Sequence, residues 1–159
     1  MTRNSNDVRV KDVMSRDVVT AYPDDSLRVA LQLLVENRVS ALPIVDSKQR
    51  CIGMLSTTDL VDLECDHEND LDQLNAADPY TRQWLQRKID AGLAAQQIKE
   101  VMCEHVNSVS GEASIVEATR EMLRNRVHRL PVTDAKGRLI GIVSTMDILN
   151  AFVDGVAVA

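Results

Sequence analysis

Aromatic side chains are scarce in this chain of 159 residues, which has two tyrosines, one tryptophan and one phenylalanine. Proteins that bind single-stranded nucleic acid stack the bases on aromatic side chains, so this class of function is disfavoured. A basic surface is lacking as well, because 18 basic and 24 acidic residues give a net charge of −6, whereas duplex binders carry a basic face. We therefore expect a core of aliphatic side chains and no nucleic-acid partner.

Long hydrophobic runs and paired cysteines are also lacking. No stretch approaches the roughly 18 apolar residues of a membrane span, and the N-terminal MTRNSND has no apolar core of a signal peptide. The cysteines, Cys51, Cys65 and Cys103, are odd in number and have no CxxC spacing, which suits a reducing compartment better than a disulfide framework. We expect a cytoplasmic protein with no membrane partner.

The chain does contain an internal repeat. Shifting the sequence by 88 positions aligns residues 10–63 with residues 98–151 without a gap, and 19 of the 54 aligned positions are identical. Two amphipathic segments that are similar by chance would not keep the same proline, glycine, serine and aspartate in one register, so the repeat reflects a duplication. Since about 54 residues is near the lower limit for independent folding, we expect the two units to pack face to face around a shared core.

The sequence of each repeat predicts the element order strand, helix, strand, strand, helix. This order places the chain in the α/β (α+β) fold class. The extended segment 18–20 precedes a stripe of apolar residues at helical spacing. The stripe consists of Leu27, Ala30, Leu31, Leu34 and Val35 in the first unit, and of Ile115, Ala118, Met122 and Leu123 in the second. The second helix begins with a capping box, Ser114 and Glu117. Asn37 and Asn125, each followed by arginine, are expected to end these helices.

A β-hairpin and a second helix complete each predicted unit. Two short apolar runs flank the polar loop 46–50, and the copy of this loop contains Gly137. Pro43 and Pro131 are expected at the first positions of their strands, where the missing N–H breaks no ladder bond. The final helices are expected at residues 57–63 and 145–152.

Residues 66–97 have no counterpart in the repeat. After an acidic stretch, residues 80–97 have helical composition, with Trp84, Leu85, Ile89 and Leu93 spaced for one face. This helix is either a solvated linker or an arm packed on a partner subunit. We favour the packed arrangement because Trp84 is the only tryptophan and large apolar groups are rarely left in water.

An acidic cluster at the start of this insert is the nearest approach to a metal site. It consists of Cys65, Asp66, His67, Glu68 and Asp70. Their spacing matches no zinc or calcium pattern, so a solvated linker is favoured over a metal site. We expect no bound metal.

The motif Gly-x-x-Ser-x-x-Asp occurs once in each unit. Its residues are Gly53, Ser56 and Asp59 in the first unit, and Gly141, Ser144 and Asp147 in the second. The glycines permit close approach by a ligand or by another backbone. The serines lie where a strand turns into a helix, so their hydroxyls and the first-turn N–H groups suit an anion, while the aspartates can accept hydrogen bonds from a vicinal diol. This arrangement fits a ribose 5′-phosphate, although Ser-x-x-Asp is also a capping box.

The two units differ at one chemically important place. The second has His128 and Arg129 just before the Leu-Pro dipeptide, whereas the first has Ser40 and Ala41. An arginine at a strand start offers a permanently charged, bidentate donor for phosphate. The alternative interpretation is a surface arginine beside a half-buried histidine.

Together these motifs resemble the tandem cystathionine-β-synthase (CBS) domain pair, often called a Bateman module. The resemblance rests on VKDVM and IKEVM, on SALPIVD and HRLPVTD, and on GMLSTTD and GIVSTMD. It implies one repeat at residues 8–65, a helical insert at 66–97 and a second repeat at 96–154, packed with pseudo-two-fold symmetry. It also implies binding of adenosine-containing ligands, such as AMP, ADP, ATP or S-adenosylmethionine, in clefts between the repeats. The HRLPV segment is similar to the segment that contacts nucleotide phosphates in the gamma subunit of AMP-activated kinase.

By analogy with this family, each cleft combines the Ser/Asp pair of one repeat with the first strand of the other. One cleft would use Ser144 and Asp147 with Thr20, Ala21, Leu42 and Pro43; the other would use Ser56, Thr58 and Asp59 with Ser108, Val109, Leu130 and Pro131. The cleft that Arg129 serves is left open by the sequence.

The sequence therefore predicts a regulatory module that senses an adenosine-type ligand and acts in trans on a separate effector protein, as a homodimer. The alternative is a structural dimerisation module that is indifferent to nucleotides, with the 66–97 helix as the contact. No Ser/His/Asp set, Cys/His set or P-loop is present, so we expect neither an enzyme nor a catalytic cofactor.

Overall fold

The computed structural model describes residues 7–62, 79, 83, 87 and 95–154. The chain forms two compact units, and these do not coincide with the two sequence repeats. Unit 1 comprises Met1–Val18, Ser47–Cys51 and Asn107–Ala159, and unit 2 comprises Val19–Asp46 and Ile52–Val106.

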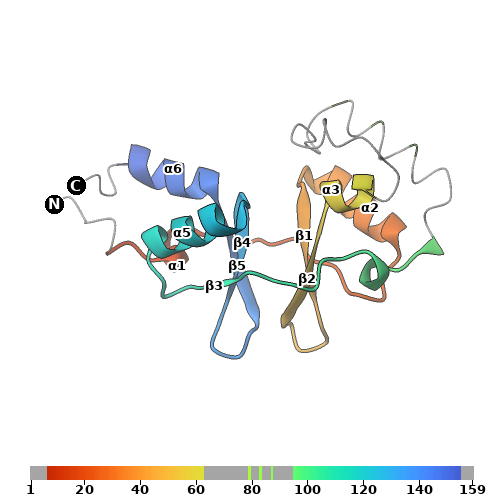
Figure 1. The fold of residues 1–159 in the computed structure, drawn as a ribbon, viewed down its shortest axis with the longest axis horizontal. Coiled ribbons are helices and arrows are strands. Elements are labelled where there is room, and N and C mark those ends of the chain that lie inside the picture. Colours follow the sequence, from red (N-terminus) through yellow and green to blue (C-terminus); the bar gives the residue numbers. More distant parts are fainter. Residues whose placement is uncertain (1–6, 63–78, 80–82, 84–86, 88–94, 155–159) are drawn as a thin grey trace. The chain divides into compact units, whose positions relative to one another are not determined.

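Unit 1 is a three-stranded sheet with helices. Its elements are α1 (Val10–Val13), β3 (Val109–Ser110), α5 (Ile115–Asn125), β4 (Arg129–Thr133), β5 (Leu139–Ser144) and α6 (Thr145–Val153). Strand β4 lies in the middle, parallel to β3 and antiparallel to β5. Helices α5 and α6 contact β4, β5 and each other, on the left of Figure 1. The predicted element order is confirmed in this unit.

Unit 2 follows the same plan with a shorter first strand. It contains α2 (Leu27–Asn37), β1 (Ala41–Val45), α3 (Thr57–Asp62) and the 3₁₀ turn η3 (Ile98–Glu100), and β2 (Cys51–Ser56) pairs with β1. The predicted strand at 18–20 is reduced to a single parallel bridge between Ala21 and Ile44. The helix predicted at residues 80–97 lies almost wholly outside the described residues. None of the described helices is long and apolar enough to cross a membrane.

The segment that opens each repeat packs into the unit formed by the rest of the other repeat. We call residues 8–16 and 96–104 the leading segments. Val10 N–H donates to Ala113 O at 2.8 Å, and at the equivalent place Ile98 N–H donates to Asp25 O at 2.9 Å. Ser15 and Ile142 exchange two backbone hydrogen bonds of 2.9 Å, and Cys103 and Met54 do the same in unit 2, at 2.9 and 3.0 Å. The repeats have therefore exchanged their leading segments.

Each unit has an apolar core of its own, and the face-to-face packing of the two repeats stays a prediction. The unit 1 core is built around β4, β5 and the inner face of α5, with Val10 of the first repeat fully buried in it. The unit 2 core is built around α2, β1 and β2, with Ile98 of the second repeat fully buried in it. Met14 and Met102 pack against these two cores.

Two details of the predicted repeat need correction. Pro43 and Pro131 occupy the third positions of β1 and β4 instead of the first. Pro131 costs no ladder bond there, because the N–H and C=O of its partner Ile142 both bond to Ser15 on the other side. Leu123, expected on the buried face of α5, is 73% exposed.

The predicted helix ends are confirmed. Ser114 Oγ accepts the N–H of Glu117 at 3.1 Å, and Glu117 Oε2 accepts the N–H of Ser114 at 2.7 Å. This double hydrogen bond to Ser114 holds the pKa of Glu117 below its usual range. At the other end, Arg38 and Arg126 follow the terminal asparagines in the left-handed conformation with φ 53°. Gly137 has φ 77° in the β4–β5 loop, as the hairpin prediction requires.

Candidate functional site

The structure brings the Ser/Asp pair of each unit together at the start of a helix. In unit 2, Asp59 N–H donates to Ser56 Oγ at 3.2 Å, and Ser56 N–H donates to Asp59 Oδ2 at 2.8 Å. In unit 1, Ser144 and Asp147 make the same two hydrogen bonds, also at 3.2 and 2.8 Å. Each pair is therefore a capping box. In the described part of the chain, Oδ1 of each aspartate makes no hydrogen bond, so it is the oxygen available to a diol.

The surroundings of the two capping boxes differ. In unit 2, Ser56 Oγ shares a hydrogen bond of 2.6 Å with Thr58 Oγ1. In unit 1 the equivalent residue is Met146, which is 61% exposed. Asp59 therefore has two hydroxyl groups beside it, whereas near Asp147 the apolar Met146 takes the place of the threonine.

Arg129 joins the capping box of unit 1. It is the first residue of β4, as predicted, and it lies opposite Ser144 in the β4–β5 register. Arg129 is half-buried, and burial lowers the pKa of its guanidinium while the charge of Asp147 raises it. Because arginine stays protonated throughout the physiological range, Arg129 is a fixed cation beside Asp147. His128 is exposed, and its carbonyl accepts the N–H of Thr145 at 2.9 Å.

The glycines of the motif serve the close approach of another backbone. A Cβ at Gly141 would lie 2.6 Å from Met14 Sδ and 2.8 Å from Ser15 O. A Cβ at Gly53 would lie 2.7 Å from Met102 Sδ and 3.2 Å from Cys103 O. The space in front of each glycine is therefore filled by a leading segment, and the structure favours this role over ligand contact.

Several other predicted site residues belong to the cores. Leu42, Leu130 and Ala21 are at most 1% exposed, and Pro43 and Pro131 are buried as well. Only the backbone of these residues could meet a ligand. Thr20 is half-buried, Ser108 is exposed and Val109 is 7% exposed. The predicted combinations of Ser144 with Thr20 and of Ser56 with Ser108 join residues of different units, and they remain predictions.

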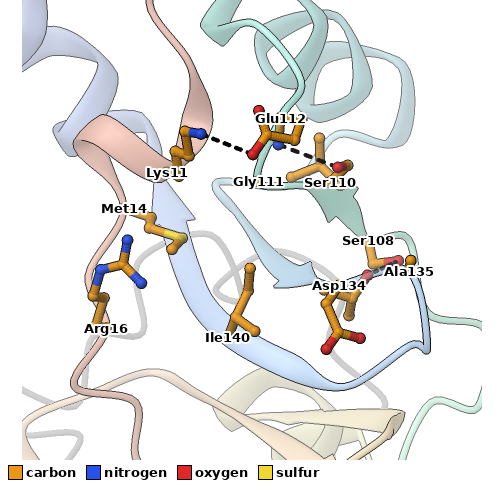
Figure 2. A pocket seen from close by; sticks show the side chains of 12 residues that line it. Lys11, Met14, Arg16, Ser108, Ser110, Gly111, Glu112, Asp134, Ala135 and Ile140 are labelled. Carbon is orange, nitrogen blue, oxygen red and sulfur yellow. Dashed lines mark hydrogen bonds and ion pairs between the residues drawn. The ribbon is translucent and has the colours of Figure 1, made fainter.

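Unit 1 contains a pocket of about 490 Å³ between its leading segment and the 108–112 and 133–140 segments. Figure 2 shows Lys11, Met14 and Arg16 on the leading segment and Ser108, Asp134 and Ala135 on the facing wall. The remaining lining residues are Val109, Ser110, Gly111, Glu112, Thr133 and Ile140. The pocket thus combines apolar surface, hydroxyl groups and charges, and its residues come from both sequence repeats.

The pocket lies at the opposite end of β4 and β5 from the capping box. Thr133 and Ile140 line it, whereas Arg129 and Ser144 close the other end of the same two strands. Four residue steps along β4 span about 13 Å. Of the predicted site residues, the pocket therefore includes Ser108 and Val109 and leaves out the Ser/Asp pair and Arg129.

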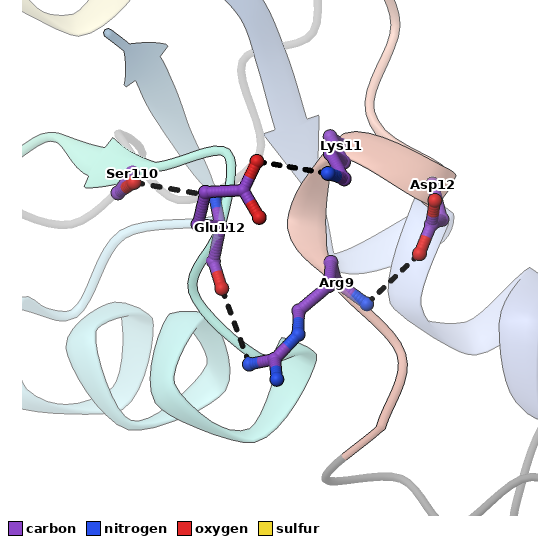
Figure 3. A network of polar contacts seen from close by, with 5 residues as sticks. All are labelled: Arg9, Lys11, Asp12, Ser110 and Glu112. Atoms are coloured by element: carbon purple, nitrogen blue, oxygen red, sulfur yellow. Dashed lines mark hydrogen bonds and ion pairs between the residues drawn. The ribbon is translucent and has the colours of Figure 1, made fainter. Parts of the chain in front are cut away.

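An ion pair ties the leading segment to one wall of the pocket. Lys11 Nζ lies 2.8 Å from Glu112 Oε1, and Arg9 Nη1 donates to the backbone oxygen of Glu112 at 3.2 Å (Figure 3). Ser110 Oγ accepts the N–H of Glu112 at 3.2 Å. In unit 2 the equivalent pair, Lys99 and Asp24, has a separation of 2.9 Å. The same contact thus recurs where each exchanged segment meets its unit.

The second carboxylate of the pocket is committed to the β4–β5 loop. Asp134 accepts the N–H groups of Arg138 and Lys136, both at 2.9 Å, and the Arg138 Nε–H at 2.8 Å. These bonds, first among them the Arg138 amide, hold the pKa of Asp134 below its usual range. In the described part of the chain Arg16 has no hydrogen bond or ion pair, so it is the pocket's uncompensated charge.

Sequence reasoning missed the contribution of Lys11 and Arg16 because it assigned each leading segment to its own repeat, and it also missed Asp134, which lies in the β4–β5 loop. The recurring charges at 11 and 99 and at 24 and 112 could have suggested that a leading segment pairs with one of these carboxylates, but they suit either copy and do not reveal the exchange. Among the described residues no group of three or more His, Cys, Asp or Glu side chains could hold a metal. The acidic cluster at residues 65–70 lies outside the described ranges.

Comparison with known proteins adds to this geometry. The family model for the CBS domain matches residues 10–65 and 98–154. The chain is similar to the CBS-pair protein CBSX2 from Arabidopsis thaliana, with 26% identity and a TM-score of 0.74 over 92% of this chain and 95% of that one. CBSX2 in complex with AMP is also similar, with 27% identity and a TM-score of 0.71 over 92% and 97% of the two chains.

Two curated relatives are similar in sequence. A CBS domain-containing protein of Dictyostelium discoideum is 29% identical over 92% of each chain. The gamma-3 subunit of 5′-AMP-activated protein kinase of Sus scrofa is 30% identical over 87% of this chain and 24% of that subunit.

Proposed function

Because the chain belongs to the family of CBS-domain proteins and carries the domain twice, we propose that it is a regulatory module that senses an adenosine-containing ligand. The occupied state would be detected by a separate effector protein in trans, and the chain itself would perform no catalysis. The observation that carries the proposal is the pocket of unit 1, whose apolar, hydroxyl and cationic lining suits a nucleoside phosphate. The AMP complex of the similar protein CBSX2 supports this ligand class.

Isothermal titration with AMP, ADP, ATP and S-adenosylmethionine tests the proposal directly. We expect saturable heat with at least one of them. Ligand at about 100 times its Kd should stabilise the protein by about 2.7 kcal/mol, which a thermal shift would register. The absence of both heat and thermal shift at millimolar concentration would refute ligand sensing.

The sequence predicts that the Ser/Asp pairs bind the ribose. In unit 1 this pair lies at the other end of β4 and β5 from the pocket, and Asp147→Ala tests this role. If Asp147 Oδ1 accepts from the ribose, the substitution weakens nucleotide binding on the order of tenfold, the value of a charge-assisted hydrogen bond. Glu117→Ala is the matched control, because Glu117 closes the capping box of α5 in the same way and has no proposed ligand contact. If the two variants bind the nucleotide with equal affinity, Asp147 only caps its helix and does not bind the ligand.

A second candidate function, dimerisation independent of nucleotides, is favoured by the exposed face of α6. Met146, Leu149, Phe152 and Val153 recur at helical spacing on this face and are 38–85% exposed. Contiguous exposed apolar groups mark interaction sites, and we propose that a second copy of the chain covers them.

Leu149→Glu would place a charge in this face. If a second copy covers α6, the variant should sediment as a monomer at concentrations where the original chain sediments as a dimer. Ser47→Glu, which adds the same charge in the exposed β1–β2 loop, should remain a dimer. Identical sedimentation of Leu149→Glu and the original chain would show that α6 is not the contact.

A further inference from the structure

The 88-residue repeat allows the pocket of unit 1 to be compared with the equivalent positions of unit 2. Lys11, Met14 and Ile140 correspond to Lys99, Met102 and Ile52, so the apolar floor and the tethering lysine occur in both units. The ion pair that fastens the leading segment is also common to both. The framework of the two positions is therefore the same.

The groups that would meet a ligand differ between the units. Arg16 in unit 1 corresponds to Glu104 in unit 2, and both side chains are exposed. Ser110 corresponds to Tyr22, a much larger side chain that is 46% exposed. The hydroxyl of Thr133, which lies 3.5 Å from Ser108 Oγ, corresponds to Val45, which has none. Ser110 therefore leaves more room in unit 1 than Tyr22 leaves at the equivalent position of unit 2, while each set of positions has three hydroxyl groups.

The charges differ in the same direction. The pocket of unit 1 has two cations, Lys11 and Arg16, and two carboxylates, Glu112 and Asp134. The equivalent positions of unit 2 have one cation and three carboxylates, so their formal charge is −2 where that of unit 1 is zero. The carboxylates of unit 1 are engaged by Lys11 and by the β4–β5 loop, which leaves the charge of Arg16 to act on a ligand.

The capping-box end repeats this asymmetry. Arg129 stands beside Asp147 in unit 1, and its counterpart in unit 2 is the uncharged Ala41. Arg16 and Arg129, at the two ends of the unit 1 strands, thus have no cationic equivalent in unit 2. Nearby cations attract an anionic ligand and nearby carboxylates repel it. Solvent and salt screen both interactions but do not change their sign.

We propose that the two units differ in ligand specificity: unit 1 takes the phosphorylated, anionic ligand, with Arg16 as a specificity-determining residue, and the equivalent position of unit 2 rejects it. This inference rests on the proposed function and adds to it the number of phosphorylated ligands bound per chain and the charge of the ligand that each unit accepts. One phosphorylated ligand binds per chain, and unit 2 is left with uncharged ligands.

Titration with AMP, and with adenosine as the uncharged probe, tests the inference in 0.15 M salt. We expect one AMP per chain. Arg16→Glu should weaken AMP binding at least about tenfold, the value of a charge-assisted contact, and change adenosine binding less than about twofold. Arg16→Lys should retain most of the affinity. Because Arg16 is exposed and makes no hydrogen bond or ion pair in the described chain, these variants should fold normally, which circular dichroism would verify.

Two further variants separate a local effect from a general one. Arg28→Glu makes the same charge change at an exposed position of unit 2 and should leave AMP binding unchanged. Glu104→Gln should not alter the affinity for the single AMP. Two AMP molecules per chain, or equal weakening by Arg16→Glu and Arg28→Glu, would overturn the inference while ligand sensing stands. If the original chain binds none of adenosine, AMP, ADP, ATP and S-adenosylmethionine, the proposed function fails, and the inference with it.

Discussion

Gly141→Ala should destabilise the protein by about 3 kcal/mol, because the added methyl group has no room. Its Cβ would lie 2.8 Å from Ser15 O, a backbone atom that cannot rotate away. Ser15 O also accepts the N–H of Ile142 at 2.9 Å, so moving it breaks the bridge that holds the leading segment on β5. Met14 Sδ, at 2.6 Å from the same Cβ, adds a second clash. Urea unfolding followed by circular dichroism measures the loss.

The repeat supplies the matched control for this substitution. At Gly53 the nearest backbone atom, Cys103 O, would lie 3.2 Å from the new Cβ, and the closer contact is the flexible end of Met102. Gly53→Ala should therefore cost about 1 kcal/mol. Gly137→Ala meets nothing within 4 Å and should cost only the strain of its positive φ, about 1 kcal/mol. If Gly141→Ala costs no more than these two variants, the close approach of Ser15 is not rigid.

The element types were predictable from the sequence because they depend on local patterns. Leu27, Ala30, Leu31 and Leu34 recur at helical spacing and are all buried, and Ser114 and Glu117 cap their helix as expected. The prediction that Leu123 is buried was wrong because the buried face of α5 is narrower than the apolar stripe in the sequence. The prediction that Pro131 begins its strand was wrong because some interior positions of a strand make no hydrogen bond to a given neighbouring strand. The periodicity of the sequence does not show which positions these are.

The partner of each leading segment was not predictable from periodicity. Val10 and Ile98 are both apolar, Lys11 and Lys99 both basic, and Glu112 and Asp24 both acidic, so either segment suits either unit. The local sequence pattern predicts that a leading segment packs against a core, but it does not show whether that core belongs to the first or the second repeat. The pocket of unit 1 depends on that choice, because Lys11, Met14 and Arg16 line it only after the exchange.

Val10→Asp should therefore unfold the unit that carries the rest of the second repeat. Val10 is fully buried in the core of unit 1, among residues of β4, β5 and α5. An unpaired carboxylate there should cost more than about 4 kcal/mol. Hydrogen exchange resolved by peptide should show loss of protection in α5, β4, β5 and α6, residues 115–153, although the substitution lies in the first repeat.

Ile98→Asp is the mirror experiment, because Ile98 is the counterpart of Val10 and is also fully buried. It should remove protection from α2, β1 and β2 and spare residues 115–153. Lys11→Asp, next to Val10 but on the exposed side, breaks only the pair with Glu112 and should cost no more than about 1 kcal/mol. If Val10→Asp instead unprotects α2 and β1, the repeats fold as contiguous units and the leading segments are not exchanged. The pocket of unit 1, which requires Arg16 beside Ser108, would then lose its basis as well.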